Sequence, residues 1–220
     1  MFKKYWKFFV IFWSVVLVGI IGVFVFFWLI SAGKLGFMPT FEELENPNNR
    51  FASEVYFADG PIMNRYFEKE NRKYIEYREI PQSVIDALIA TEDVRFYDHS
   101  GVDVRGLFRV AKGLLTANTS AGGGSTISQQ LAKMLFPRES DLNVFELAIR
   151  KFREWVIAVR LEKSYTKEEI LTMYLNKYDF LNLAVGISSA ADIYFQVPLD
   201  SLKVEQAAML IGMAKNSSYY

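Results

Sequence analysis

The chain has 220 residues, enough for one domain with a buried core and, in addition, a tail or an anchor. Apolar residues make up 51% of it, which argues against disorder, and 25 basic residues balance 25 acidic ones, which leaves no overall basic field for nucleic acid. Because the chain has no cysteine, disulfide frameworks, thiolate metal sites and cysteine nucleophiles are excluded.

An uncharged segment covers residues 8–33 and is rich in Val, Ile, Phe and Trp. As a helix it would be roughly 39 Å long, enough to cross a hydrocarbon core of about 30 Å with some tilt. The alternatives are a cleaved signal peptide, whose apolar region is usually about 7 to 15 residues long, and a buried core helix. The length favours a single uncleaved transmembrane helix.

Three lysines, Lys3, Lys4 and Lys7, precede this segment. The positive-inside rule therefore predicts a cytoplasmic tail over residues 1–7 and an exported remainder close to the bilayer.

The exported part begins with a connector over residues 34–50, which contains glycine, two prolines and an acidic run. Residues 51–80 indicate short strands around a turn at Asp59-Gly60, the pattern of a β-hairpin. From Pro81 to residue 220 the pattern is helical. The predicted fold class is therefore mainly α with a small β element.

The first predicted helix of this part runs from Pro81 to about Glu92. Asp103 can cap a second helix, whose apolar stripe comprises Leu107, Phe108, Ala111, Leu114 and Leu115. The small residues of 116–124, which end in three glycines, predict a mobile loop.

Four more helices complete the pattern, and two of their starts have capping-box spacing, Thr126 with Gln129 and Thr166 with Glu169. A long helix is expected over about 142–163 and a last one over 203–215. The buried seam of the long helix is predicted to consist of Phe145, Ile149, Phe152, Val156 and Val159.

Three segments carry residues suited to chemistry. The first, residues 92–101, begins with Glu92-Asp93 at a helix end, where the Glu92 carboxylate can project into a cleft, and it contains Phe96 and His99. The plain alternative is an ordinary polar helix terminus with a hydrogen-bonded packing histidine.

The second segment, residues 124–133, is a glycine loop that runs into a capped helix. Its backbone N–H groups and helix dipole suit an anion, and Lys133 would add a full charge two turns further on. A capped helix with a solvated lysine is the alternative, and the Walker order of residues is missing.

The third segment places Arg150, Lys151 and Glu154 on one helical face. Taken alone, this spacing favours a surface ion-pair ladder worth a few tenths of a kcal/mol.

Together, in this order and behind a membrane span, the three segments resemble glycosyltransferase family 51, the peptidoglycan polymerase domain of class A penicillin-binding proteins and monofunctional transglycosylases. Residues 167–176 and 186–195 also resemble it, so that the likeness covers about 51–220. It implies a lysozyme-like helical domain with a small β-hairpin, preceded by one transmembrane helix. The implied location is the bacterial inner membrane, crossed once, with a cytoplasmic N-terminus and an outer catalytic domain.

The resemblance implies an enzyme that polymerises lipid II into β-1,4-linked glycan by an inverting displacement. Glu92 maps onto the general base, favoured in that role by burial and by the adjacent Asp93. Glu154 maps onto the second essential carboxylate, which either holds cations or binds a divalent ion. The residues implied to bind substrate are Asp93, Phe96, His99, Ser125, Thr126, Gln129, Gln130, Lys133, Arg150 and Lys151.

No cofactor is implied as obligatory, although Mg²⁺ or Mn²⁺ could sit beside the diphosphate. The implied partners are lipid II, the growing glycan strand, the bilayer and the cell-wall synthesis machinery, with no nucleic acid. A lysozyme-like muramidase or lytic transglycosylase and a non-catalytic membrane-anchored scaffold are the competing interpretations. Both a monofunctional enzyme and part of a bifunctional one fit the chain.

The sequence departs from the family pattern at five positions. Residues that stand where the family usually has another are Met134 for Asn, Thr172 for Glu, Leu181 for Gly, Gln196 for Gly and Ser217 for Pro. None of these changes removes a presumed catalytic group.

Overall fold

The structure is a computed structural model that describes residues 2–40, 53–56, 62–66, 73–116, 123–136 and 143–215. Helices dominate these residues, so the predicted mainly α fold is confirmed. The helices are α1 (Phe2–Ser31), α3 (Gln82–Glu92), α4 (Val104–Leu115), α5 (Ile127–Leu135), α6 (Val144–Ser164), α7 (Lys167–Lys177), α8 (Ile187–Phe195) and α9 (Val204–Lys215). The predicted mobile loop over 116–124 lies mostly outside the described residues.

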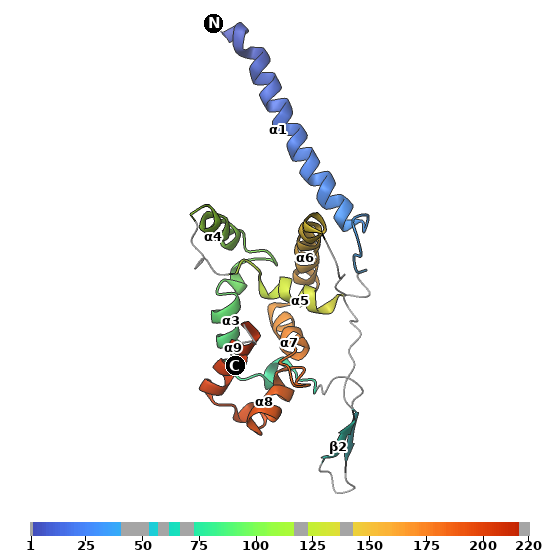
Figure 1. Cartoon of the computed structure of the whole chain (residues 1–220), viewed down its shortest axis with the longest axis vertical. Coiled ribbons are helices and arrows are strands. Elements are labelled where there is room, and N and C mark those ends of the chain that lie inside the picture. The colour runs from blue at the N-terminus through green and yellow to red at the C-terminus, as the bar shows by residue number, and fades with distance from the viewer. Residues whose placement is uncertain are drawn as a thin grey trace.

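The first helix of the chain, α1, extends away from all the others (Figure 1). From Tyr5 to Ser31 it is long and apolar enough to cross a membrane, and the most apolar window of that segment is not buried against the protein. This matches the predicted span over 8–33 within a few residues. An N-terminal signal sequence can pass the same test of length and hydropathy.

Two strands, β1 (Ser53–Tyr56) and β2 (Ile62–Tyr66), pair antiparallel. The register sets Ser53 opposite Tyr66 and shifts between Val55 and Tyr56. The predicted Asp59-Gly60 turn lies outside the described residues, as does much of the predicted β segment 51–80.

The core is formed where α5 packs on α7 and α3 packs on α9. Fully buried side chains of these helices include Leu88, Leu131, Leu171, Tyr174 and Leu210. Since each apolar residue removed from water contributes about 1.5–3 kcal/mol, this cluster holds α3, α5 and α7 together. The end of α3 and the start of α5 carry most of the residues singled out in the sequence.

The predicted buried seam of α6 was wrong. The buried residues of α6 are Arg153, Ile157, Ala158 and Leu161, whereas Phe145 is 71% exposed. The ring of Phe152 contacts α1 instead, with centroids 5.4 Å from Phe26 and 5.7 Å from Phe27. Apolar periodicity was present on the predicted face, but that face meets α1 and the exterior of the domain.

The apolar stripe of α4 also points outward. Phe108 is 72% exposed and Leu115 is 89% exposed, while the small residues Gly106 and Gly113 are buried. In Figure 1, α4 and α6 lie at the end of the helical domain nearest α1, and α8 lies at the opposite end. Exposed apolar residues are therefore present at the end where the apolar helix α1 is attached.

Candidate active site

The carboxylate of Glu92 lies at the end of α3, as predicted, and is half-buried. Its Oε2 accepts a hydrogen bond of 2.6 Å from Nε2 of Gln130 on α5. Its Oε1 is buried and has no hydrogen-bond partner in the described part of the chain. A buried carboxylate oxygen is costly to leave without a donor, so Oε1 is able to accept a hydrogen bond from a bound group.

Gln130 is itself held in place by Tyr174 of α7. The Tyr174 hydroxyl donates to Oε1 of Gln130 over 3.0 Å, which leaves the amide NH₂ to face Glu92. Burial, and then the charge of Glu92, raise the pKa of Tyr174, so the phenol stays protonated and remains a donor. A chain of two hydrogen bonds thus orients the carboxylate from the core.

Asp93 and His99, both predicted to bind substrate, contact each other, and His99 also lines a pocket with Arg95 and Asp103. Nε2 of His99 lies 3.0 Å from Oδ2 of Asp93, and the backbone N–H of Gly101 donates to Nδ1, which places the ring proton on Nε2. The backbone N–H of Ile127 donates to Oδ2 of Asp93 over 3.1 Å. The pair therefore ties the end of α3 to the start of α5.

Phe96 is fully buried, with the ammonium group of Lys167 4.2 Å from its ring centroid. Lys167 also donates to the backbone oxygen of His99 and pairs with Glu162. Phe96 thus packs in the core beneath residues 92–101, and its ring is not exposed to solvent.

Thr126 and Gln129 are buried at the start of α5. Thr126 caps the helix by accepting from the N–H of Gln129, as the spacing predicted. The reciprocal half of the capping box is absent, because Nε2 of Gln129 donates to the backbone oxygen of Gly101, which Thr126 also contacts. Both side chains therefore fasten the first segment to the second.

Lys151 joins the second and third segments. Its Nζ donates to Oγ of Ser125 over 2.8 Å and to Oε2 of Glu154 over 2.9 Å. The predicted shared face of Arg150, Lys151 and Glu154 is present, and Lys151 is the cation that pairs with the carboxylate. Since the Glu154 side chain is only 12% exposed, this pair has an orienting role that a surface ladder lacks.

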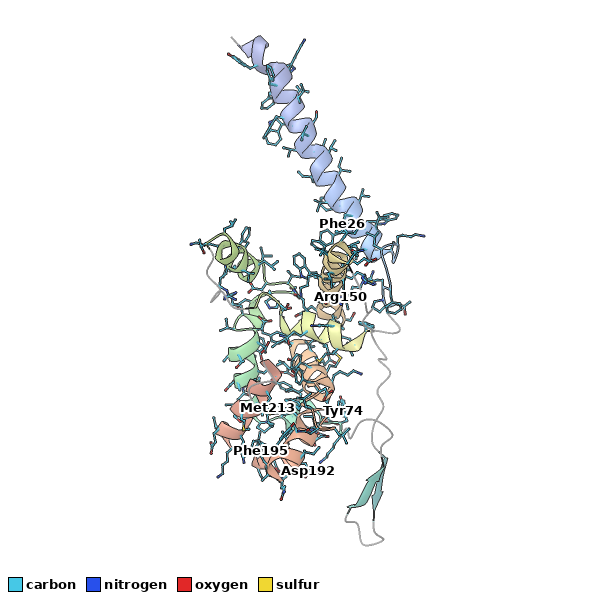
Figure 2. The ribbon with its side chains drawn as sticks, viewed as in Figure 1. Phe26, Tyr74, Arg150, Asp192, Phe195 and Met213 are labelled. Atoms are coloured by element: carbon cyan, nitrogen blue, oxygen red, sulfur yellow. The ribbon has the colours of Figure 1, made fainter. Side chains whose placement is uncertain are left out.

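A small pocket of about 40 Å³ opens between α5 and α6, and Lys133, Arg150 and Glu154 line it. Arg150 comes from α6, close to α5 (Figure 2). Neither Lys133 nor Arg150 has a hydrogen bond or ion pair with any residue in the described ranges. Two cations without protein partners in one pocket suit a multiply charged anion.

Glu92 does not line this pocket, but α5 connects the two. Gln130, which holds Glu92, and Lys133, which lines the pocket, are three residues apart on α5 and so are neighbours on its surface, about 5–6 Å apart at Cβ. The Glu92 carboxylate and Lys133 therefore lie against one side of α5.

Within the described ranges, no three His, Asp or Glu side chains gather to hold a metal ion. Glu154 is the carboxylate that the described lining of the pocket offers. A divalent ion there would take its other ligands from a bound phosphate and from water, as Mg²⁺ often does.

Sequence reasoning did not single out Tyr174, whose hydroxyl holds Gln130. It also missed Arg153 and Phe37, which line the pocket. A tyrosine at a core position is a weak signal by itself, because nothing in its spacing shows where the hydroxyl points.

Comparison with known proteins gives a consistent result. Residues 59–220 match the family model described as transglycosylase. The chain is 37% identical over 183 residues to "Penicillin-binding protein 1A" of Escherichia coli strain K12, an alignment that covers 83% of this chain and 21% of that protein. The proteins of the same name from Pseudomonas aeruginosa and Neisseria lactamica are 37% and 36% identical over the same share of the chain, each covered to 22%. The chain thus spans about a fifth of the length of these curated relatives.

Proposed function

Because this chain belongs to the transglycosylase family, a family of peptidoglycan glycosyltransferases, we propose that it polymerises lipid II into β-1,4-linked glycan strands. In this reaction the acceptor 4-hydroxyl oxygen bonds to the anomeric carbon of the donor. The bond from that carbon to the diphosphate oxygen breaks with inversion, and polyprenyl diphosphate leaves.

One observation carries the assignment of the base: Oε1 of Glu92 is buried and lacks a donor, while Oε2 is fixed by Gln130. An acceptor hydroxyl at Oε1 would supply the missing hydrogen bond and then give up its proton there. A fixed carboxylate within hydrogen-bond reach of the hydroxyl is the geometry that general-base catalysis requires.

The leaving diphosphate needs positive charge as its bond to the sugar breaks. Lys133 and Arg150, which have no partner among the described residues, would supply it in the pocket between α5 and α6. Lys151 neutralises Glu154 beside them, so that the carboxylate does not repel the anion. No divalent cation is expected to be obligatory, although Glu154 could ligate Mg²⁺ or Mn²⁺ shared with the diphosphate.

The proposed location is the bacterial inner membrane, with α1 as a single span, the N-terminus in the cytoplasm and the helical domain outside. The exposed apolar residues Phe108 and Leu115 of α4 and Phe145 of α6 support it, since these two helices lie at the end of the helical domain nearest α1 (Figure 1). Burial of such residues in the interfacial region of a bilayer would remove them from water. The cell-wall synthesis machinery remains a predicted partner.

The test is a polymerisation assay with purified lipid II, run with Mg²⁺ and with a chelator. Glu92→Gln is expected to fold normally and to lose about 10²- to 10⁴-fold in rate, the usual contribution of a positioned base. Glu205→Gln, an exposed carboxylate at the start of α9, is the matched control and is expected to be fully active. A Glu92→Gln variant that polymerises at the normal rate would remove Glu92 from this role.

Parallel reactions with finished glycan test the competing interpretations. Cleavage of glycan in place of polymerisation would indicate a lysozyme-like hydrolase, which needs a carboxylic acid beside water and no diphosphate pocket. Absence of both activities from the unaltered chain would favour a scaffold.

A further inference from the structure

A buried ion pair joins the end of α6 to the start of α7. Nζ of Lys167, the first residue of α7, lies 2.7 Å from Oε2 of Glu162 in the last turn of α6. The Glu162 side chain is only 4% exposed, and its Oε1 also accepts a hydrogen bond from Oγ of Ser128 on α5. The pair therefore connects three helices at one point.

The ammonium group of this pair also reaches the first segment, residues 92–101. It donates to the backbone oxygen of His99 over 2.7 Å and lies 4.2 Å from the ring centroid of Phe96. Because an ammonium group has three N–H donors, Lys167 can hold Glu162 and the His99 carbonyl at the same time.

The contacts of the first segment form a closed ring with α5. The His99 ring contacts Asp93, and Asp93 accepts a hydrogen bond from the backbone N–H of Ile127 at the start of α5. The next residue of α5 is the serine that donates to the carboxylate of the ion pair. Since Asp93 directly follows Glu92, this ring of contacts ends beside the proposed base.

The end of the segment is held between α5 and α6 as well. Gly101 has a φ of +94°, and a Cβ there would come within 2.8 Å of the backbone of Ala158 on α6. Its carbonyl oxygen accepts a hydrogen bond from Oγ1 of Thr126 over 2.7 Å. Lys167 adds the contact from α7, so three helices determine the path of this segment.

Stability alone does not account for an ion pair in this place. Removal of two charges from water costs about as much as their attraction returns, and apolar side chains of similar size are often at least as stabilising. An apolar pair, however, cannot donate a hydrogen bond to the His99 carbonyl. The directional bond to the first segment is therefore what Lys167 and Glu162 add to the fold.

We propose that Lys167, held by Glu162, is a positioning residue for the reaction. It fixes the backbone of residues 92–101 so that the Glu92 carboxylate meets Gln130 and the acceptor hydroxyl. Lys167 does not touch the substrate and acts only through Glu92. The inference rests on the proposed function, in which Glu92 is the base.

The experiment measures kcat and KM for lipid II polymerisation, and the melting temperature, of the full chain in detergent. Lys167→Met keeps an apolar stem and removes the donors. It is expected to lower kcat about 10- to 10²-fold and to change KM by less than about twofold. Lys163→Met, at an exposed position in the last turn of α6, is the matched control and should be as active and as stable as the wild type.

A double variant separates positioning from stability. Lys167→Met leaves Glu162 buried without its cation, which should lower the melting temperature. In Glu162→Met/Lys167→Met no charge is left unpaired, so the melting temperature should return most of the way to that of the wild type. Its kcat should stay low, because the hydrogen bond to His99 is still missing. Recovery of kcat together with the melting temperature would overturn the inference.

A double-mutant cycle tests whether Lys167 acts through Glu92. Lys167→Met should cost about 10- to 10²-fold in the wild type and less than about threefold in the Glu92→Gln background. Equal losses in both backgrounds would overturn the inference. A normal rate of Lys167→Met beside an impaired Glu92→Gln refutes only this inference, whereas a normal rate of Glu92→Gln refutes the base assignment of the proposed function and this inference with it.

Discussion

Gln130 donates a 2.6 Å hydrogen bond to one oxygen of Glu92, and the other oxygen of that carboxylate is buried without a donor. The hydrogen bond from Gln130 fixes the orientation of the carboxylate. The unpaired oxygen, Oε1, can accept a hydrogen bond from a ligand. Because the amide of Gln130 is fixed in turn by Tyr174, the geometry of the proposed base depends on a residue of the core.

Tyr174→Phe should therefore lower kcat by about 10- to 10²-fold while KM changes little, because Gln130 loses the partner that orients its amide. The buried Oε1 of Gln130 also loses its donor, which should cost about 1–3 kcal/mol of stability. Polymerisation kinetics over a range of pH and chemical denaturation measure the two effects. Tyr178→Phe is the control, since it removes a tyrosine hydroxyl that bonds to the backbone of Ala214 and does not contact Gln130. An equal loss of kcat in both variants would show that the effect is one of stability.

Glu154→Gln should reduce polymerisation by about 10- to 10²-fold, since the charged hydrogen bond from Lys151 is worth about 1.5–3 kcal/mol. Without it Lys151 is no longer held between Ser125 and α6, and the cationic side of the pocket loses its order. Glu146→Gln, at the start of the same helix, retains a side chain suited to the capping box and should be fully active. If Glu154→Gln polymerised at the wild-type rate, Glu154 would have only the role of an ion-pair partner of Lys151.

Local features were predictable because their causes are local. The capping box of Thr166 and Glu169 forms as predicted, and α3 ends at Glu92 as predicted. These outcomes depend on hydrogen bonds within a few residues, which the sequence specifies directly.

What could not be predicted depends on which distant element approaches a given face. The apolar periodicity of α6 correctly predicted a helix, but it could not show that Phe152 would meet α1 and that Ile157 and Leu161 would form the core contact. From the sequence alone, the Asp93 carboxylate could have faced a ligand. In the structure it accepts a hydrogen bond from the backbone N–H of Ile127 on α5. Resemblance to a family singled out the candidate residues, and only the packing showed which of them are buried.

Two of the departures from the family pattern lie where the backbone is left-handed. Leu181 has a φ of 68°, and Gln196, the cap residue of α8, has a φ of 54°. Residues with a Cβ are strained there by about 1–2 kcal/mol, which explains why glycine is usual at both positions. Met134 and Thr172 instead pack at or in the core, and Ser217 lies outside the described residues.

Leu181→Gly and Gln196→Gly should each relieve about 1 kcal/mol of backbone strain. The measured gain in the free energy of unfolding should be smaller, because glycine loses more conformational entropy on folding. Chemical denaturation of each variant measures the gain. Lys112→Gly, at an exposed position within α4 with ordinary helical backbone, is the control and should destabilise by about 1 kcal/mol. Loss of stability in Leu181→Gly would mean that the leucine side chain makes a contact worth more than the backbone strain.

The contact between Arg95 and Asp103 should make the stability of the protein depend on pH in the acidic range. Oδ2 of Asp103 accepts a hydrogen bond from Nε of Arg95 over 3.1 Å, which fastens the turn after α3 to the start of α4. That hydrogen bond lowers the pKa of Asp103 below its ordinary value, despite some burial. A carboxyl group whose pKa is lowered by folding contributes stability above its unfolded pKa of about 3.9, and the contribution disappears as the pH falls through the folded pKa.

Asp103→Asn should therefore have a lower melting temperature than the wild type at pH 7 and pH 5. Below about pH 3 the melting temperatures of the two proteins should become equal. Asp86→Asn, an exposed carboxylate on α3, should show no such convergence. A difference between Asp103→Asn and the wild type that stayed constant at every pH would mean that the asparagine perturbs packing, and that the ionised pair contributes nothing to holding the turn against α4.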